Sequence, residues 1–413
     1  MNSKQLKLLV IIFVCIGVVG YLLVTQNNKS WSQGEQAIGG KVMPDFPMND
    51  VTQIAVKSNV GEATLVKVDE TWRVSDRANY AADFSKIREL LLAVGECKIL
   101  RKMQVGESQL GRLELLTPEN ADKTGLLLTF KGEADKEIGT LLLGKQSMRK
   151  SESSSFGGGE FPDGRYLLPD GDSSRIAFVS ETFSNVEIEA KAWLDKTFFK
   201  VEKLKSVEVT HADPLQSWAV NRESETGEMI LAGLGEKEEL DSSRSYSLKN
   251  VLSSPSFNDI ASSDIGDEDL GLDAPIKAML TTFDGFNYEI HMGKANQDEE
   301  YPIRLKVSAD ISTQRNPAEG EKEEDKESLD KEHADQVKAL QGKLEAEQKF
   351  QGHTFMVSKW TVDALTKPRS DYIKAIEENT EDGTDNQQTL PALPTLPGVN
   401  LDTLTNPLNL GSE

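Results

Sequence analysis

The part of the chain that follows residue 49 is organised as short runs in which apolar and polar residues alternate. Three such runs succeed one another with only turn-length gaps between them: Gln53–Val56, Ala63–Val68 and Trp72–Val74. Alternation with a period of two is typical of a half-buried strand, because successive side chains point to opposite faces of a sheet. The pattern therefore predicts a meander of antiparallel strands with one face in water.

The next segment has a helical period. Four apolar residues recur at i, i+3, i+4 and i+7: Ile87, Leu90, Leu91 and Val94. They predict one apolar helix face, with Asp83 as the N-cap and Gly95 as the end of the helix. Four more strands are expected after it: Gly125–Lys131, Ile138–Leu143, Arg165–Leu168 and Ile176–Val179. Ser151–Gly164 is predicted to be a flexible loop, and Glu181–Trp193 a helix.

The second half of the chain repeats this order of elements. Strands are expected at Leu204–Thr210, Ser217–Asn221, Met229–Leu231, Ile276–Thr282, Tyr288–Met292, Ile303–Val307 and Thr354–Val357. Asp284-Gly285 is a hairpin turn signal. Helices are predicted at Ser245–Leu252, before Pro255, and at Lys359–Leu365. Strands that follow one another in sequence, with helices to one side, make α+β the expected fold class.

Short motifs of the two halves match at a regular spacing. Trp72 of Thr71–Val74 has its counterpart in Trp218, 146 residues later, and Gly144-Lys145 has its counterpart in Gly293-Lys294, 149 residues later. Phe178 and Phe355 begin a third matching pair, which is 177 residues apart. A fixed period indicates duplication, and the longer last offset indicates an insertion. We therefore interpret residues 50–202 and 203–373 as two tandem copies of one module.

A charged segment at about 316–349 interrupts the second copy. Two interpretations of it stay open: an exposed charged helix or partly disordered loop, and a partner-binding coiled-coil arm. Val337, Leu340 and Leu344 have the spacing of a coiled-coil seam, but Gly342 disfavours a long rigid coil. The many Glu and Lys side chains predict that this segment adds nothing to a core.

The chain also has an apolar run near its start. Leu8–Val24 holds 17 uncharged residues after Lys4 and Lys7, which predicts a membrane anchor over residues 1–25 with a cytoplasmic N-terminus. The remaining chain would then be periplasmic or extracytoplasmic, on the inner membrane, behind a linker at 26–49. A cleaved signal peptide is the alternative. Cys15 would suggest a lipoprotein, but Val14 before it is not small.

Residues 374–413 predict an acidic, Pro/Leu-rich disordered tail. The repeated Leu-Pro steps of Leu390–Pro397 suit either a groove-binding peptide or an inert extension. The 413 residues carry a net charge of −22, which disfavours nucleic-acid binding because phosphates would be repelled. Cys15 and Cys97 do not suggest a disulfide framework.

No motif of the chain carries a recognisable catalytic or metal-binding set. The histidines are few and scattered: His211, His291, His333 and His353. His211 with Asp213 is expected to be structural, and the run Asp267–Asp269 lacks the spacing of an EF-hand loop. We predict no catalytic, cofactor-binding or metal-binding residues, and hence a protein that is not an enzyme. Trp72 and Trp218 are expected to be core residues, with a ligand platform as the alternative.

Two sets of residues resemble a known family. The first is Trp72–Val74 followed by Tyr80–Asp83, and the second is Leu270–Pro275 followed by Asp284-Gly285 and Met292–Lys294. Together they resemble the bacterial exported domain of unknown function 4340, in two copies over about 50–373. The chain departs from the family where Ala81 replaces a frequent proline and where the charged segment is inserted.

The resemblance implies an N-terminal anchor and association with ABC-transporter components of the gliding-motility-associated kind. The family has no established catalytic residues, so none are transferred to this chain. We therefore expect a membrane-anchored extracytoplasmic scaffold or accessory subunit of an envelope complex. The alternative is a periplasmic module that binds a small molecule or glycan in the cleft between the two repeats, where paired modules often bind ligands.

Overall fold

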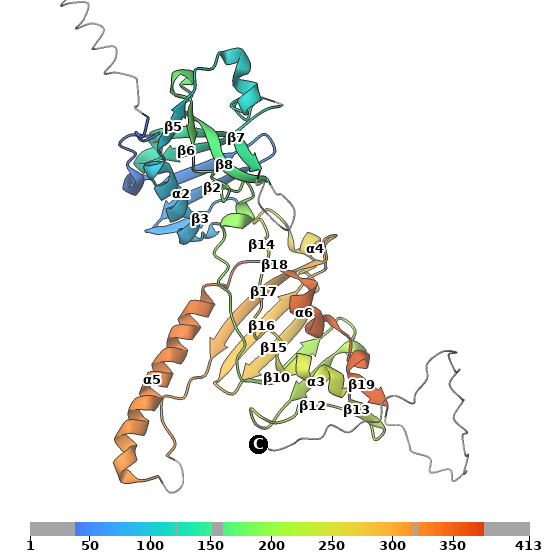
Figure 1. The fold of residues 1–413 in the computed structure, drawn as a ribbon. Coiled ribbons are helices and arrows are strands. Elements are labelled where there is room, and N and C mark those ends of the chain that lie inside the picture. The colour runs from blue at the N-terminus through green and yellow to red at the C-terminus, as the bar shows by residue number, and fades with distance from the viewer. Residues whose placement is uncertain (1–37, 121, 151–159, 318–320, 376–413) are drawn as a thin grey trace, which may run out of the picture. The chain divides into compact units, whose positions relative to one another are not determined.

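The computed structural model describes residues 38–120, 122–150, 160–317 and 321–375 (Figure 1). The predicted anchor Leu8–Val24, Cys15 and the predicted tail beyond residue 375 lie outside the described residues, as do residues 26–37 of the predicted linker. Residues 38–49 were also predicted to be linker, but they belong to the fold, because Val42 and Met43 are buried in its core. Within the described ranges, no helix is long and apolar enough to cross a membrane.

The fold is α+β, as predicted, with two large antiparallel sheets and few helices (Figure 1). The first sheet has the order β4-β3-β2-β1-β6-β7-β8-β9-β5. Its strands are β1 (Gln53–Lys57), β2 (Glu62–Val68), β3 (Thr71–Val74), β4 (Tyr80–Ala81), β5 (Ile99–Lys102), β6 (Leu126–Lys131), β7 (Glu137–Lys150), β8 (Glu160–Pro169) and β9 (Ala177–Val179).

The second sheet has the order β12-β11-β10-β15-β16-β17-β18-β14. Its strands are β10 (Leu204–Thr210), β11 (Trp218–Asn221), β12 (Ile230–Leu231), β14 (Asp259–Ile260), β15 (Ile276–Thr282), β16 (Phe286–Met292), β17 (Glu300–Ala309) and β18 (Phe355–Ser358). A separate pair joins β13 (Glu238–Leu240) and β19 (Ile373–Ala375).

Helices lie between these strands. The α-helices are α2 (Phe84–Glu96), α3 (Ser242–Lys249), α4 (Asp267–Leu270), α5 (Glu323–Gln348) and α6 (Lys359–Thr366). The 3-10 helices are η1 (Met48–Asp50), η2 (Glu107–Leu113), η3 (Glu133–Asp135), η4 (Ser173–Arg175), η5 (Ala190–Trp193), η6 (Pro214–Gln216) and η7 (Arg369–Tyr372).

The alternation of apolar residues in β1 places its side chains as predicted. Ile54 is fully buried and faces Leu65 of β2 and Phe130 of β6 in register. The apolar face of α2 is buried as well, and Asp83 caps this helix by accepting a hydrogen bond from the Ser85 amide at 2.9 Å. Gly95 does not end the helix. It is a buried helical residue where a Cβ would lie 2.7 Å from Cε of Met48.

Two predictions around the end of the first sheet are wrong. The expected loop Ser151–Gly164 is wrong from Glu160 onward, because β8 begins there, and residues 151–159 of it lie outside the described residues. The expected helix Glu181–Trp193 has only the short turn η5, and Phe183 has a φ of +51°. Its carbonyls are bound elsewhere: the Arg165 guanidinium donates to the Thr182 and Phe183 oxygens, and the Trp193 indole donates to the Glu187 oxygen. Tertiary hydrogen bonds therefore replace the helical ones.

The strand orders of the two sheets correspond on one side. β6-β7-β8-β9 with the edge strand β5 has the same order as β15-β16-β17-β18 with the edge strand β14. On the other side, three strands flank β1 but only two flank β10. Trp72 lies on β3, two strands from β1, whereas Trp218 lies on β11, directly beside β10. The two tryptophans that match in sequence therefore stand on strands that do not correspond.

The Gly-Lys match does fall at corresponding places, on β7 and directly after β16. A Cβ on Gly144 of β7 would lie 2.5 Å from the Leu113 oxygen, and a Cβ on Gly293, after β16, would lie closer still to the Leu270 oxygen. Each carbonyl ends a short helix that is followed by a left-handed residue, Glu114 or Gly271. At both places a backbone carbonyl lies so close to the chain that only glycine, which has no Cβ, fits there.

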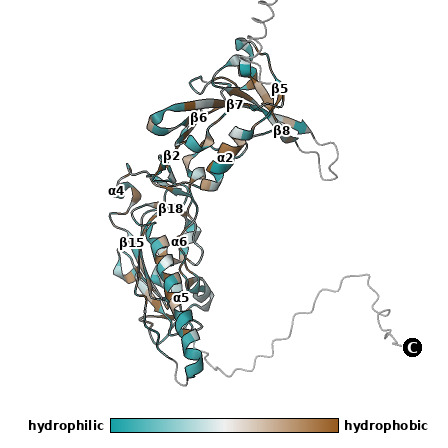
Figure 2. Cartoon of the chain, turned by 90° about the vertical axis from the view of Figure 1, so that its left-hand side faces the viewer, coloured by the Kyte–Doolittle hydropathy of each residue, from teal (hydrophilic) through white to brown (hydrophobic). Residues whose placement is uncertain are grey.

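The charged segment contains α5, which connects β17 to β18 (Figure 1). Most of α5 is exposed, and the hydrophilic colouring along it in Figure 2 agrees. Its last two turns differ, because Leu340 and Leu344 pack against the core and Glu347 is only 6% exposed. The expectation that this segment adds nothing to a core is therefore wrong for these turns.

Candidate functional site

The histidines of the chain do not form a catalytic arrangement with nearby acids in the described residues. The His211 ring lies 3.2 Å from the Lys367 oxygen, while Asp213 caps η6 through the Leu215 amide. His291 pairs with Glu289 of the same strand, with 3.0 Å between Nε2 and Oε1. His333 lies on α5.

The acidic run Asp267–Asp269 forms part of the short helix α4. Both carboxylate oxygens of Asp267 accept hydrogen bonds from Arg304, at 2.6 and 3.0 Å. The bond to this guanidinium lowers the pKa of Asp267. Among the described residues, no group of three or more His, Cys, Asp or Glu side chains has the geometry to hold a metal ion.

The two tryptophans lie in separate surroundings. The Trp218 indole donates a hydrogen bond of 3.0 Å to the Lys367 oxygen and packs against Tyr372, with 4.7 Å between the ring centroids. Trp72 is 5% exposed and lines a depression of about 400 Å³ beside Phe84. A ligand platform built from both indoles in one cleft does not match these positions.

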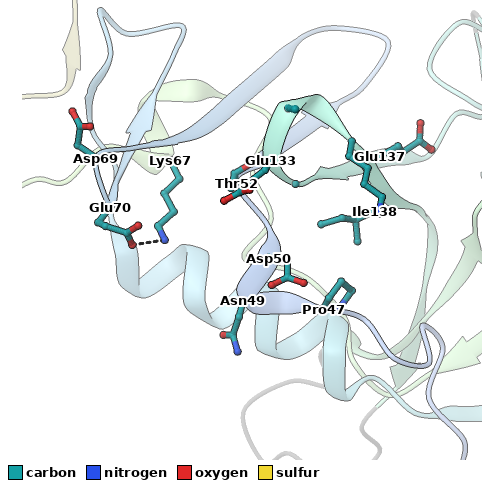
Figure 3. A pocket seen from close by; sticks show the side chains of 13 residues that line it. Pro47, Asn49, Asp50, Thr52, Lys67, Asp69, Glu70, Glu133, Glu137 and Ile138 are labelled. Carbon is teal, nitrogen blue, oxygen red and sulfur yellow. Dashed lines mark ion pairs between the residues drawn. The ribbon is translucent and has the colours of Figure 1, made fainter.

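A broad groove of about 1100 Å³ lies at one end of the first sheet (Figure 3). It is bordered by η1, by the β2–β3 turn with Asp69 and Glu70, and by the β6–β7 turn with Glu133. Lys67 and Glu70 form an ion pair of 2.6 Å across part of it. The groove is wide and its lining is mostly polar and acidic, so its shape does not select a particular ligand.

A smaller cavity of about 600 Å³ has a more convergent lining. It is bounded by β3 and β4, by the connection at Asp195, by the end of α5 and by His353. The residues that line it are Thr71, Arg73, Tyr80, Ala81, Asp195, Thr197, Ala346, Lys349, Phe350 and His353. We call it the junction cavity. Residues 71–81 and 195–197, which precede the second sheet in sequence, meet residues 346–353 there.

Burial favours the neutral form of two side chains in the junction cavity, His353 and Tyr80. The Tyr80 ring contacts the His353 ring edge-on, with 5.0 Å between centroids. Burial lowers the pKa of His353, with the nearby Arg73 charge adding to the effect, and burial raises the pKa of Tyr80. His353 Nδ1 is buried and has no hydrogen-bond partner among the described residues. The sequence carried no signal for this cavity, because its lining comes from segments far apart in the chain.

Residues 72–275 match the family model of a domain of unknown function (DUF4340). Neither the comparison with curated proteins nor the comparison with solved structures gave a match. The DUF4340 match begins within β3 and ends just before β15, so it contains parts of both sheets. The sequence motif Leu270–Pro275 lies inside it, whereas Met292–Lys294 lies beyond it. The match covers one DUF4340 span, and it does not show the second copy that is expected from the sequence.

The DUF4340 span contains Arg73, Tyr80 and Asp195 of the junction cavity, but Lys349 and His353 follow it. The helix α5 also lies beyond the span. We call the last two turns of α5, which contain Leu340, Leu344 and Glu347, its base. The base is joined to the DUF4340 span, because Glu347 accepts a hydrogen bond of 3.0 Å from the Lys200 amide. It also accepts one of 2.8 Å from the Tyr288 hydroxyl. The base of α5 is therefore fixed to the second sheet through a buried carboxylate.

Proposed function

We propose that the protein is a membrane-anchored, extracytoplasmic, non-enzymatic scaffold or accessory subunit of an envelope complex. Its expected partner is an ABC transporter of the gliding-motility-associated kind. The single observation that carries the proposal is α5, whose 26 residues are exposed along most of their length and held at one end. A partner can bind along the length of such a charged helix, and no buried core residue has to become exposed.

Contacts at the base of α5 hold this helical surface in one position on the fold. Glu347 joins the helix to Lys200 and Tyr288, and Lys343 pairs with Glu202 at 2.6 Å. Phe350 follows directly and packs edge-on against Phe198, with 5.4 Å between ring centroids. These contacts restrain the helix at its C-terminal end, so less conformational entropy is lost when a partner binds.

The anchor is proposed from the sequence. Leu8–Val24 is long enough to cross the hydrocarbon core, and Lys4 and Lys7 favour a cytoplasmic N-terminus. Under this proposal, full-length protein resists carbonate extraction, and protease reaches it only from the periplasmic side. A mature chain that begins after residue 24 would instead identify a cleaved signal peptide.

The two-copy origin is a proposal as well. It is supported by the common order of β6–β9 and β15–β18 and by the glycines Gly144 and Gly293, which meet equivalent carbonyls. The unequal strands beside β1 and β10 show how far the halves differ. In this interpretation, α5 is an addition to the second copy, because only a short connection with η4 joins β8 to β9.

The scaffold proposal is tested by purifying the full-length chain from cross-linked, detergent-solubilised membranes. Lys331 and Lys338 are exposed on α5, and their joint replacement by Glu reverses the charge there. The matched control makes the same charge change at Lys277 and Lys306, which are exposed on the second sheet. We expect a membrane or transporter protein to be recovered with wild type and control and lost with the α5 variant. Recovery of no envelope protein by wild type refutes the proposal.

The alternative is a small-molecule or glycan-binding module, and the unpartnered Nδ1 of His353 in the junction cavity favours it. A thermal-shift screen of small carboxylates and sugars is the test. A ligand of this cavity should raise the melting temperature of wild type but not of His353→Ala. The control Trp218→Ala should simply destabilise the fold, because Trp218 packs in the core away from the cavity lining.

A further inference from the structure

The first described residues of the chain lie along the edge strand of the first sheet. The Gly39 amide donates to the Ile99 oxygen at 2.8 Å, and the Ile99 amide donates to the Gly40 oxygen at 2.9 Å. Lys41 and Lys98 face each other in an antiparallel bridge. The chain therefore reaches the folded body at β5, and this edge is the nearest part of the fold to whatever precedes residue 38.

The same edge is basic, although the chain as a whole has a net charge of −22. Lys41, Lys98, Arg101 and Lys102 are all exposed. None of the four forms an ion pair within the described part of the chain. Arg101 lies over the Phe178 ring, 4.4 Å from its centroid. Glu96 is the exposed acid that lies next to this edge in sequence.

Apolar side chains stand among these basic groups. Leu100 is 46% exposed between Lys98 and Lys102, and Ile38 is 72% exposed at the start of the entering segment. We call the surface formed by Ile38, Lys41, Lys98, Leu100, Arg101 and Lys102 the basic edge. Exposed apolar groups that stand among cations are typical of peripheral surfaces that meet an anionic, partly apolar partner.

An open depression continues the basic edge on the same sheet. It has a volume of about 570 Å³ and is lined by Met103, which follows β5, and by Arg112 and Lys145. Met148, on the extended part of the β7–β8 hairpin, also lines it and is 49% exposed. Glu107 and Glu114 are the acids of η2 and its cap. Cationic and apolar groups thus extend beyond the edge strand itself.

We propose that the basic edge rests on the anionic lipid headgroups of the membrane that holds the anchor. This proposal depends on the anchor proposed above. Only 13 residues separate Val24 from Ile38. Fully extended, they span at most about 45 Å, so the edge stays close to the bilayer surface. Tethering raises the local concentration of the basic edge at the lipid.

The chemistry of the basic edge fits this partner. Lysine and arginine near an anionic bilayer each add roughly a fivefold factor to binding, since each contributes about 1 kcal/mol. Leu100 and Ile38 can enter the boundary between headgroups and acyl chains, as exposed apolar groups of peripheral proteins do. The contact would fix the orientation of the first sheet above the membrane and leave α5 to a protein partner.

The test uses the full-length chain in vesicles, with a polarity-sensitive fluorophore on Leu100→Cys. Cys15 is replaced by Ala. Cys97 stays unlabelled because it is buried, and burial raises the pKa of its thiol to about 12. The control label is on Val60→Cys, which is 77% exposed at the β1–β2 turn of the same sheet. One vesicle set is phosphatidylcholine alone and the other contains phosphatidylglycerol.

We expect the Leu100 label to shift to the blue and to be quenched by lipid-borne quenchers in the anionic vesicles only. Replacement of Lys98 and Lys102 by Glu should abolish the shift, and their replacement by Arg should preserve it. A Leu100 label that stays as exposed as the Val60 label in anionic vesicles overturns the proposal. Shielding in native membranes but not in vesicles overturns it in favour of a protein partner.

Carbonate extraction of the same vesicles separates the two proposals. If carbonate releases the protein, the anchor proposal fails. Flotation before extraction then decides about the basic edge. Retention on anionic but not on neutral vesicles supports the lipid contact, and retention on neither overturns it.

Discussion

Replacing Glu347 by Ala should weaken the attachment of α5 to the second sheet. In the folded chain its carboxylate accepts hydrogen bonds from the Lys200 amide at 3.0 Å and the Tyr288 hydroxyl at 2.8 Å. The Lys343 ammonium is farther away, at 4.0 Å. Glu347 is 6% exposed, so water cannot readily replace these bonds. The variant therefore removes the acceptor of the buried Tyr288 hydroxyl and of the part-buried Lys200 amide.

The size of the effect depends on how those donors are compensated. The Tyr288 hydroxyl also lies 3.1 Å from the Lys200 oxygen, so it can donate there instead. The part-buried Lys200 amide has no second acceptor among the described residues, and an unsatisfied donor costs about 1–3 kcal/mol when water cannot reach it. We expect Glu347→Ala to reduce the free energy of unfolding by about 2–3 kcal/mol. Glu347→Gln, which keeps an acceptor for Lys200, should cost about 1 kcal/mol.

The effect should depend on pH in a defined direction. Burial raises the pKa of Glu347 above its ordinary value of 4.5, although the bonds from Lys200 and Tyr288 oppose this. The folded state therefore holds the proton more tightly than the unfolded state. Its contribution to stability is present below pH 4.5 and is lost as pH rises through the raised folded pKa. Glu347→Gln lacks this loss, so its deficit relative to wild type should shrink as pH rises.

Urea unfolding of the detergent-solubilised chain measures these changes. The buried indoles of Trp193 and Trp218 report the transition by fluorescence. Tyr288→Phe and the double variant with Glu347→Ala complete a double-mutant cycle, which isolates the coupling between the two side chains. A Glu347→Ala variant within about 0.5 kcal/mol of wild type would refute the view that the base of α5 belongs to the core.

Three further changes follow from the packing. Gly144→Ala and Gly293→Ala should each reduce the free energy of unfolding by about 1–3 kcal/mol, because the new Cβ meets a backbone carbonyl. Gly342→Ala on the exposed part of α5 should increase it by up to about 1 kcal/mol, because alanine favours a helix more than glycine does. Melting temperatures of the three variants test both expectations. Asp83→Ala should cost about 1 kcal/mol by loss of the α2 cap, measured by urea unfolding. A short Gly/Ser linker in place of 323–335 should change the free energy of unfolding by about 1 kcal/mol or less. Extension of the replacement through residue 349 should unfold the second sheet, and circular dichroism would detect this loss of strand signal.

The sequence by itself was sufficient for elements whose side chains follow a simple period. The alternation of apolar and polar residues predicts β1 and β15, and alternating residues of both strands are buried. The helical period of apolar residues predicts α2, and that face of the helix is buried. The cap at Asp83 is local chemistry between near neighbours, so it also followed from the sequence. Periodicity and local capping need no knowledge of distant residues.

Tertiary contacts decided the elements that the sequence misjudged. The segment 181–193 is not a helix, because Arg165 from β8 binds its carbonyls. Gly95 lies inside its helix, which ends one residue later at Glu96, and a Cβ there would lie 2.7 Å from Cε of Met48. The strand orders also separated Trp72 from Trp218. In each case the deciding group lies on another element of the fold.

The possible sites depend most strongly on the fold. Sequence spacing can reveal only motifs whose residues stand at short, regular distances, and it predicts none in this chain. The junction cavity brings His353 to Tyr80, and the base of α5 brings Glu347 to Tyr288, across separations of 273 and 59 residues. Only the folded chain creates these pairs, because burial and hydrogen bonding between distant segments arise when the sheets close around them.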